Sequence, residues 1–224
     1  MSGREIILAR VHRALADVPA DDTPYEEVIQ RHYAHEHGER TVDETVELLA
    51  ENLADYRAIV HRATAQSLPG LIAELLTERD SHSVLAPPGV PADWLRLLHD
   101  GVHVVEDTDT STPDELDQVD SVVTGCALAV AETGTLVLDG SPDQGRRRIT
   151  LVPDHHICVV RVPSQVVSSV PQALERLEPA RPLTWISGPS ATSDIELDRV
   201  EGVHGPRRLD VVLLSTPPNG VHRA

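Results

Sequence analysis

The stretch VVTGCALAVAETGTLVLDGSPDQGRRRITL, residues 122–151, decides the fold that we expect of this chain. Its two apolar runs, Val122–Val130 and Leu136–Leu138, have the length and composition of buried strands. A polar step at residues 132–135 separates them, and a loop rich in Gly, Pro and Asp leads to three consecutive arginines. We therefore expect two strands, close enough in sequence to pair antiparallel, that carry polar side chains to one edge of a sheet.

Strand and helix patterns alternate on both sides of this stretch. Thr41 and Glu44 have the spacing of a capping box and open an amphipathic helix over Thr41–Tyr56, and apolar runs at Ile157–Val162 and Leu209–Leu214 indicate strands. We expect further strands at Ala58–Ala63, Ser83–Ala86, Val102–Val105 and Leu183–Ser187, and helices after Ser67 and Ser169 and over Pro91–His99 and Pro113–Gln118. This alternation predicts an α/β fold with a mixed, largely parallel sheet flanked by helices.

The N-terminal region differs from the rest of the chain. Ser2 and Glu5 have capping-box spacing, and a helical stripe of apolar residues follows them. A break at residues 17–24 and a polar segment come next. We therefore expect an N-terminal helical arm over residues 1–40 and an α/β domain over residues 41–224.

The composition excludes several functional classes. The 224 residues carry a formal net charge of −17, so most of the surface repels nucleic acid and anionic membranes. No apolar run approaches the roughly 20 residues of a membrane span, and the N-terminus lacks a signal-peptide pattern, so we expect a cytoplasmic protein. Cys126 and Cys158 lie in apolar runs outside any Cys-x-x-Cys pair. We expect buried thiols, with neither a metal nor an iron–sulfur cluster on this chain.

Four polar segments, residues 132–135, 144–148, 188–194 and 204–205, are candidates for a single anion-binding site. Arg146 or Arg147 can pair bidentately with an anion, although at most two of three consecutive side chains can face one ligand. The turn at 188–194 offers backbone N–H groups to an anion, unless it only caps the next element. Glu132, the candidate catalytic residue, can act as a nucleophile or a general base, or can simply cap a turn. The predicted ligand-binding residues are Thr133, Gly134, Thr135, Gln144, Gly145, Arg146, Arg147, Gly188, Ser190, Thr192, Asp194, His204 and Gly205.

Several histidines lie in expected loops. His155 and His156 could act as bases or ligand donors, but such histidines are more often structural hydrogen-bonding groups. The three histidines within residues 32–37 surround Glu36. Their spacing fits neither a His-Glu-x-x-His motif nor a zinc finger, which favours a solvated loop.

Four segments in order resemble the LUD-domain family, and most closely its lactate utilization protein C (LutC/YkgG) branch. They are TGCALAVAETGTLVLD at 124–139, DQGRRRITLVPDHHICVV at 143–160, ISGPSATSDIE at 186–196 and RVEGVHGPRRLDVVLL at 199–214. The resemblance implies a fold like that of ribose-5-phosphate isomerase, glucosamine-phosphate deaminase and the CoA transferases. It also implies a role in oxidising L-lactate to pyruvate together with LutA-like and LutB-like iron–sulfur proteins, which would hold the clusters.

Three functions remain open at this point. The chain is expected to be a subunit of an L-lactate-oxidising complex that binds a small anionic ligand or cofactor. Alternatively, it is a stand-alone acyl or CoA transferase, because residues 131–134 are similar to the Ser-Glu-Asn-Gly motif of the CoA-transferase nucleophile, with Ala131 and Thr133 replacing Ser and Asn. The third possibility is a regulatory ligand-binding module. The site hypothesis requires that the four polar segments meet at one edge of the sheet.

Overall fold

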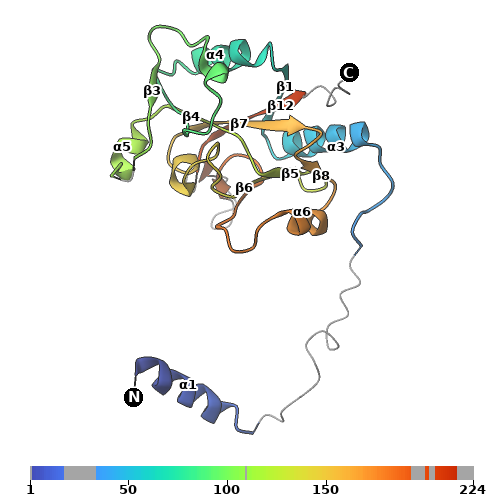
Figure 1. Cartoon of the computed structure of the whole chain (residues 1–224), viewed down its shortest axis with the longest axis vertical. Coiled ribbons are helices and arrows are strands. Elements are labelled where there is room, and N and C mark those ends of the chain that lie inside the picture. Colours follow the sequence, from blue (N-terminus) through green and yellow to red (C-terminus); the bar gives the residue numbers. More distant parts are fainter. Residues whose placement is uncertain (1, 18–33, 109, 193–199, 202–204, 216–224) are drawn as a thin grey trace, which may run out of the picture. The chain divides into compact units, whose positions relative to one another are not determined.

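The computed structural model describes residues 2–17, 34–108, 110–192, 200–201 and 205–215. These residues belong to two units, residues 1–33 and 34–224. The smaller unit contains helix α1 (Gly3–Ala14; Figure 1). This helix begins with the expected capping box between Ser2 and Glu5. The division falls at residue 33, whereas the sequence suggested a boundary at residue 40.

Six parallel strands form the main sheet of the larger unit, in the order β1-β12-β7-β4-β2-β3 (Figure 1). They are β1 (Ile59–Thr64), β2 (Ser83–Leu85), β3 (His103–Val105), β4 (Ser121–Thr124), β7 (His155–Val162) and β12 (Arg208–Ser215). β7 and β12 are buried along most of their length, as expected of parallel strands that are covered on both faces. The predicted α/β fold is confirmed, and among the described strands only those of a second sheet combine parallel and antiparallel pairing.

The second sheet has four strands, in the order β8-β5-β6-β9, and packs on one face of the main sheet. Its strands are β5 (Leu128–Val130), β6 (Thr135–Leu138), β8 (Val166–Val167) and β9 (Thr184–Ile186). β5 and β6 pair antiparallel, as the sequence predicted, with Leu128 opposite Val137. Helix α6 (Val170–Arg176) lies beside this sheet (Figure 1). It covers the other face of the sheet, where its Ala173 is buried.

Helices α3 (Val42–Asp55) and α4 (Leu68–Glu78) cover opposite faces of the main sheet. Leu49 and Leu53 of α3 are fully buried against the face that also carries the second sheet. α4 buries Ile72 and its apolar neighbours against the other face. The remaining short elements are η1 (Ala92–Leu95), α5 (Pro113–Asp117), η2 (Arg147–Thr150), β10 (Ala191–Thr192) and β11 (Val200–Glu201).

The stretch 122–151 supplies strands to both sheets. The chain crosses between the sheets at Gly125, whose N–H donates to the carbonyl oxygen of Asp143 at 2.9 Å. A Cβ atom at Gly125 would lie 2.4 Å from Asp143 Oδ2, so only glycine fits without a shift of that side chain. The first apolar run therefore divides into β4 in the main sheet and β5 in the second, instead of forming one strand.

Several local expectations differ from the structure. Residues 91–99 form only the short helix η1, and Ser67 does not cap α4, because its hydroxyl lies 3.3 Å from Thr64 Oγ1 instead. His155 and His156 are not in a loop but are the first two residues of β7, and both are buried. The turn that follows β9 leads into β10. No helix in the described part of the chain is both long and apolar enough to span a bilayer.

Candidate functional site

Two adjoining cavities lie between η2 and β9. The first has a volume of about 360 Å³ and the second a volume of about 480 Å³. Arg147, Thr150 and Thr184 line both cavities, and we call the pair the cleft. The first cavity is also bounded by His156 and Leu209, the second residues of β7 and β12. The cleft therefore lies at the amino ends of these parallel strands.

Arg147 is the first residue of η2 and supplies a positive charge to the cleft. Its side chain is exposed and lines both cavities. Within the described part of the chain, its guanidinium makes no hydrogen bond or ion pair. A guanidinium presents its N–H donors in a planar fork that matches a carboxylate or a phosphate. Arg147 is therefore the side chain best placed to bind an anion here.

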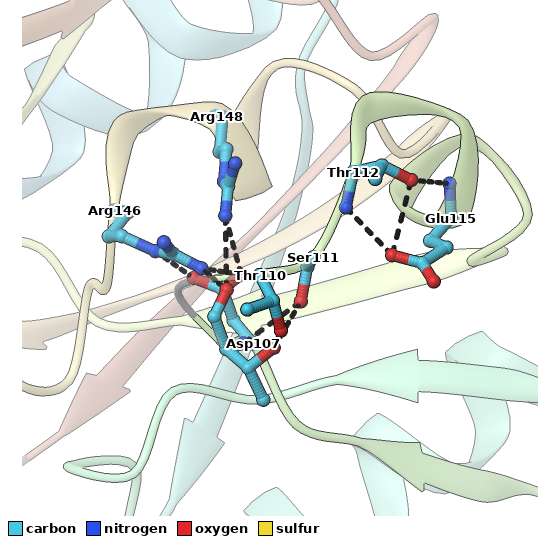
Figure 2. Close-up of polar contacts among 8 residues, drawn as sticks. Asp107, Thr110, Ser111, Thr112, Glu115, Arg146 and Arg148 are labelled. Atoms are coloured by element: carbon cyan, nitrogen blue, oxygen red, sulfur yellow. Dashed lines mark hydrogen bonds and ion pairs between the residues drawn. The ribbon is translucent and has the colours of Figure 1, made fainter.

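The arginines on either side of it are engaged by the segment that precedes α5 (Figure 2). Arg146 Nε donates to Asp107 Oδ2 at 2.5 Å, and its Nη2 contacts both Asp107 Oδ1 and the carbonyl oxygen of Thr108. Arg148 Nη2 donates to the same carbonyl at 3.0 Å. Because the Asp107 side chain is only 6% exposed, loss of Arg146 would leave a nearly buried carboxylate without its main partner.

His156 is a neutral imidazole at the inner wall of the first cavity. The residue is 1% exposed, and its Nε2 lies 2.8 Å from the hydroxyl of Thr124. Burial, together with the nearby charge of His155, lowers the pKa of His156 to about 3. The other ring nitrogen has no partner among the described residues, although His156 lines the cavity. A buried, uncharged hydrogen-bonding group thus faces the space beside Arg147.

A glycine turn forms the hydroxyl-bearing wall of the first cavity. Gly188 has a φ of +80°, and a Cβ atom on it would lie 2.2 Å from the carbonyl oxygen of Tyr56. Only glycine tolerates this combination of conformation and close approach. The turn places Ser187 and Ser190 at the cavity, and Ser190 N–H donates to the carbonyl oxygen of Pro206 at 2.8 Å.

The polar step at residues 133–135 supports this wall from behind. Thr135 Oγ1 lies 2.8 Å from Thr133 Oγ1 and 2.8 Å from Ser187 Oγ. Gly134 has a φ of +54°, and a Cβ atom there would lie 2.6 Å from the backbone of Asn52. These residues fix the position of Ser187, but they do not themselves line either cavity.

Glu132 is engaged elsewhere. Its carboxylate accepts from the backbone N–H of His37 at 3.2 Å and lies 3.0 Å from His37 Nδ1 and 3.4 Å from Arg40 Nη1. Burial acts to raise the pKa of Glu132, but the hydrogen bonds and charge of His37 and the charge of Arg40 outweigh it and lower the pKa. Glu132 is therefore an ionised, paired carboxylate that lines neither cavity of the cleft.

The structure thus brings together parts of three of the four predicted segments. The first cavity is lined by Arg147, Gly188, Ser190 and Gly205, and the second by Gln144, Gly145, Arg146 and Arg147. Neither is lined by Glu132, Thr133, Gly134 or Thr135. The side chain of Thr192 and all of Asp194 and His204 lie outside the described residues. Among the residues that are described, no three His, Cys, Asp or Glu side chains are grouped to hold a metal ion.

A buried carboxylate that the sequence did not single out lies on the opposite face of the main sheet from His156. Asp210 is 0% exposed and contacts His155 Nε2 at 2.9 Å, His61 Nε2 at 2.7 Å and Arg208 Nε at 2.6 Å. Ser121 Oγ extends the network to His155 Nδ1 at 2.8 Å. Burial acts to raise the pKa of Asp210, but its hydrogen bonds to His155, His61 and Arg208 hold the pKa far below the ordinary value.

The protein is an α/β domain of a particular class. Its all-parallel sheet carries a smaller mixed sheet on one face, and the cleft lies at their common edge. The family model of the LUD domain matches residues 46–214. The chain therefore belongs to the LUD-domain family, and the family resemblance seen in the sequence is confirmed.

Named relatives and a solved structure agree with this assignment. The chain is 48% identical over 168 residues to "Lactate utilization protein C" of Deinococcus radiodurans, covering 73% of this chain and 76% of that protein. It is 27% identical over 233 residues to the protein of the same name from Bacillus pumilus, covering 96% and 97%. A crystal structure of a DUF162 family protein from Deinococcus radiodurans matches with a TM-score of 0.67 and 40% identity, covering 79% of this chain and 99% of that one.

Proposed function

We propose that this chain serves lactate utilisation as the ligand-binding, non-redox subunit of a complex that oxidises L-lactate to pyruvate. The observation that carries the proposal is the position of Arg147, a guanidinium without a described partner between two cavities, in a chain similar to proteins named for lactate utilisation. A small carboxylate such as lactate or pyruvate, or a phosphate-bearing cofactor, would pair with Arg147. The hydroxyls of Ser187 and Ser190 would contact the uncharged part of the ligand.

The electrons would leave through partner proteins. Conversion of lactate to pyruvate releases two electrons and two protons, and an iron–sulfur cluster that accepts electrons needs several thiolate ligands. This chain has two cysteines, and both are buried. The thiol of Cys158 and burial raise the pKa of Cys126, which keeps it protonated. LutA-like and LutB-like iron–sulfur proteins are therefore the proposed electron acceptors.

A transferase using Glu132 is the second candidate. The lowered pKa keeps this carboxylate ionised, which a nucleophile requires. Its contacts with His37 and Arg40 occupy both carboxylate oxygens, which a nucleophile would need for attack, and this weighs against that role. Incubation with an acyl-CoA followed by hydroxylamine or borohydride would trap an acylated or thioester-linked Glu132 if this alternative is correct. A third possibility, regulation of complex assembly, predicts that the ligand changes co-purification with a cysteine-rich partner.

Isothermal titration calorimetry with lactate and pyruvate tests the ligand assignment. Arg147→Gln should raise the dissociation constant at least about tenfold, because it removes the charged fork that pairs with the carboxylate. Arg96→Gln is the matched control, since Arg96 pairs with Asp93 at 2.9 Å and lines neither cavity. Equal affinities for the wild type and Arg147→Gln would show that the carboxylate binds elsewhere.

Reconstitution tests the subunit role. The purified chain alone should not support lactate-dependent dye reduction, whereas its addition to the iron–sulfur partners should restore the activity. Arg147→Gln should restore less activity than Arg96→Gln at the same protein concentration. Full activity of the partners without this chain would contradict the proposal.

A further inference from the structure

The second ring nitrogen of His156 is a candidate for a further ligand contact in the first cavity. His156 is 1% exposed, and the ring nitrogens of a buried histidine normally have hydrogen-bond partners. Its Nε2 lies 2.8 Å from Thr124 Oγ1, and Nδ1 makes no hydrogen bond within the described part of the chain. Arg148 Nε is the only fully buried side-chain nitrogen or oxygen without a partner among the described residues, so Nδ1 of His156 is not sealed from its surroundings. Because His156 lines the first cavity, an occupant of that cavity can reach this nitrogen.

The alternation of side chains along β7 determines the face of the main sheet on which His156 lies. His155 and His156 are consecutive, so their side chains lie on opposite faces of the main sheet. His155 is committed to the Asp210 network on the α4 face, at 2.9 Å from that carboxylate. His156 shares the opposite face with Leu209, its register partner in β12, and both line the first cavity.

The hydrogen bond with Thr124 is compatible with either neutral tautomer of the His156 ring. A threonine hydroxyl can either donate or accept a hydrogen bond. When Thr124 donates to Nε2, the neutral ring carries its proton on Nδ1 and presents a donor to the cavity. When Thr124 accepts from Nε2–H, Nδ1 presents an acceptor. Both arrangements satisfy the 2.8 Å contact between the two side chains.

We propose that His156 recognises the oxygen on the carbon next to the carboxylate of a short 2-hydroxy or 2-oxo acid, while Arg147 holds the carboxylate. The acceptor form takes a hydrogen bond from the hydroxyl of lactate, and the donor form gives one to the carbonyl of pyruvate. This inference deepens the proposed function and rests on it. It makes His156 a specificity-determining residue and Thr124 its positioning residue.

Calorimetry with lactate, pyruvate and propionate tests the inference, because propionate has the carboxylate and lacks the neighbouring oxygen. His156→Phe keeps a planar ring and removes both nitrogens. It should raise the dissociation constants of lactate and pyruvate about tenfold and leave that of propionate within about twofold. Arg147→Gln should weaken all three acids. His103→Phe, at an exposed position of β3 outside the cleft, is the matched control.

A measurement on the wild-type protein keeps the inference testable if His156→Phe does not fold. Heteronuclear NMR of the imidazole nitrogens should show the cavity-facing nitrogen of His156 shifting in opposite directions on titration with lactate and with pyruvate. Propionate should leave it nearly unchanged. Thr124→Val, which removes the hydroxyl, should reduce the difference between the two shifts.

The outcomes separate this inference from the proposed function. If Arg147→Gln weakens all three acids while His156→Phe changes none of them, the carboxylate site stands and His156 is not a ligand contact. If His156→Phe weakens propionate as much as lactate, the residue only shapes the cavity and the inference fails. If no acid binds the wild type, the proposed ligand is wrong and the inference falls with it.

Discussion

Asp210, the third residue of β12, holds a fully buried negative charge. Its carboxylate has no exposure to solvent and is bound by His155, His61 and Arg208 at 2.6–2.9 Å. Removing one member of a buried charge network is costly, because the remaining charges lose their partner in a poorly solvated environment.

Replacement of this charge should therefore destabilise the fold. We expect Asp210→Asn to lower the free energy of unfolding by about 3–5 kcal/mol in urea titrations. The matched control is Asp93→Asn, which breaks the exposed pair with Arg96 and should cost less than about 1 kcal/mol. A loss no larger than that of the control would show that Asp210 is not a stabilising charge.

The same residue should make stability depend on pH. Its pKa is lower in the folded than in the unfolded chain, so its contribution is fully present above the unfolded value of about 3.9 and is lost as pH falls towards the folded value. The free energy of unfolding should therefore decrease below about pH 5. Urea titrations across pH 3–7 should show a shallower decrease for Asp210→Asn than for the wild type.

At the scale of elements, the turn after β9 is fixed by the backbone rather than by side chains. Gly188→Ala would add a Cβ atom 2.2 Å from the carbonyl oxygen of Tyr56 at a φ of +80°. We expect a loss of at least about 2 kcal/mol in the free energy of unfolding, together with weaker ligand binding.

A second glycine supplies the control for that prediction. Gly70 lies in the exposed part of α4, where an added Cβ atom meets nothing within 4 Å. Gly70→Ala should stabilise the fold by about 0.5–1 kcal/mol, because alanine favours the helix. Thermal unfolding followed by circular dichroism compares the two variants, and equal midpoints would contradict the argument.

At the scale of the whole molecule, the larger unit should fold without the smaller one. Helix α1 has no buried residue, and the capping box at its start stabilises it locally. A chain lacking residues 1–33 should keep the unfolding free energy of the larger unit within about 0.5 kcal/mol, since the core clusters lie within residues 34–224. Urea titration of the shortened and full-length proteins measures the difference, and a larger loss would show that the first unit stabilises the second.

Much of the fold could be predicted from local signals. Capping boxes at Ser2 and Thr41 mark helix starts that the structure confirms, because each motif satisfies backbone donors within four residues. Apolar runs located β6, β7 and β12. The division of the first run into β4 and β5 could not be predicted, since it depends on the contact of Gly125 with Asp143, which lies in another loop.

The candidate site was predictable only in part. Sequence identified the arginine run and the Gly188 turn as candidates and limited the number of arginines that can face one ligand. It placed Glu132 in the same site, whereas the structure engages Glu132 with His37 and Arg40. His156 was considered as a ligand donor but was left out of the site, because a histidine pair that follows Pro153-Asp154 resembles loop residues until the strand that contains it is known.

The sequence by itself determined the α/β class, most of the strands and helices, and the family, because propensities, caps and apolar runs act over short distances. Only the tertiary structure decided that Arg147, rather than Arg146, is without a described partner at the cleft. It also decided that His156 is neutral and faces the cavity. These properties depend on Asp107, Thr124 and strand register, which are set by pairing between distant segments and leave no local pattern.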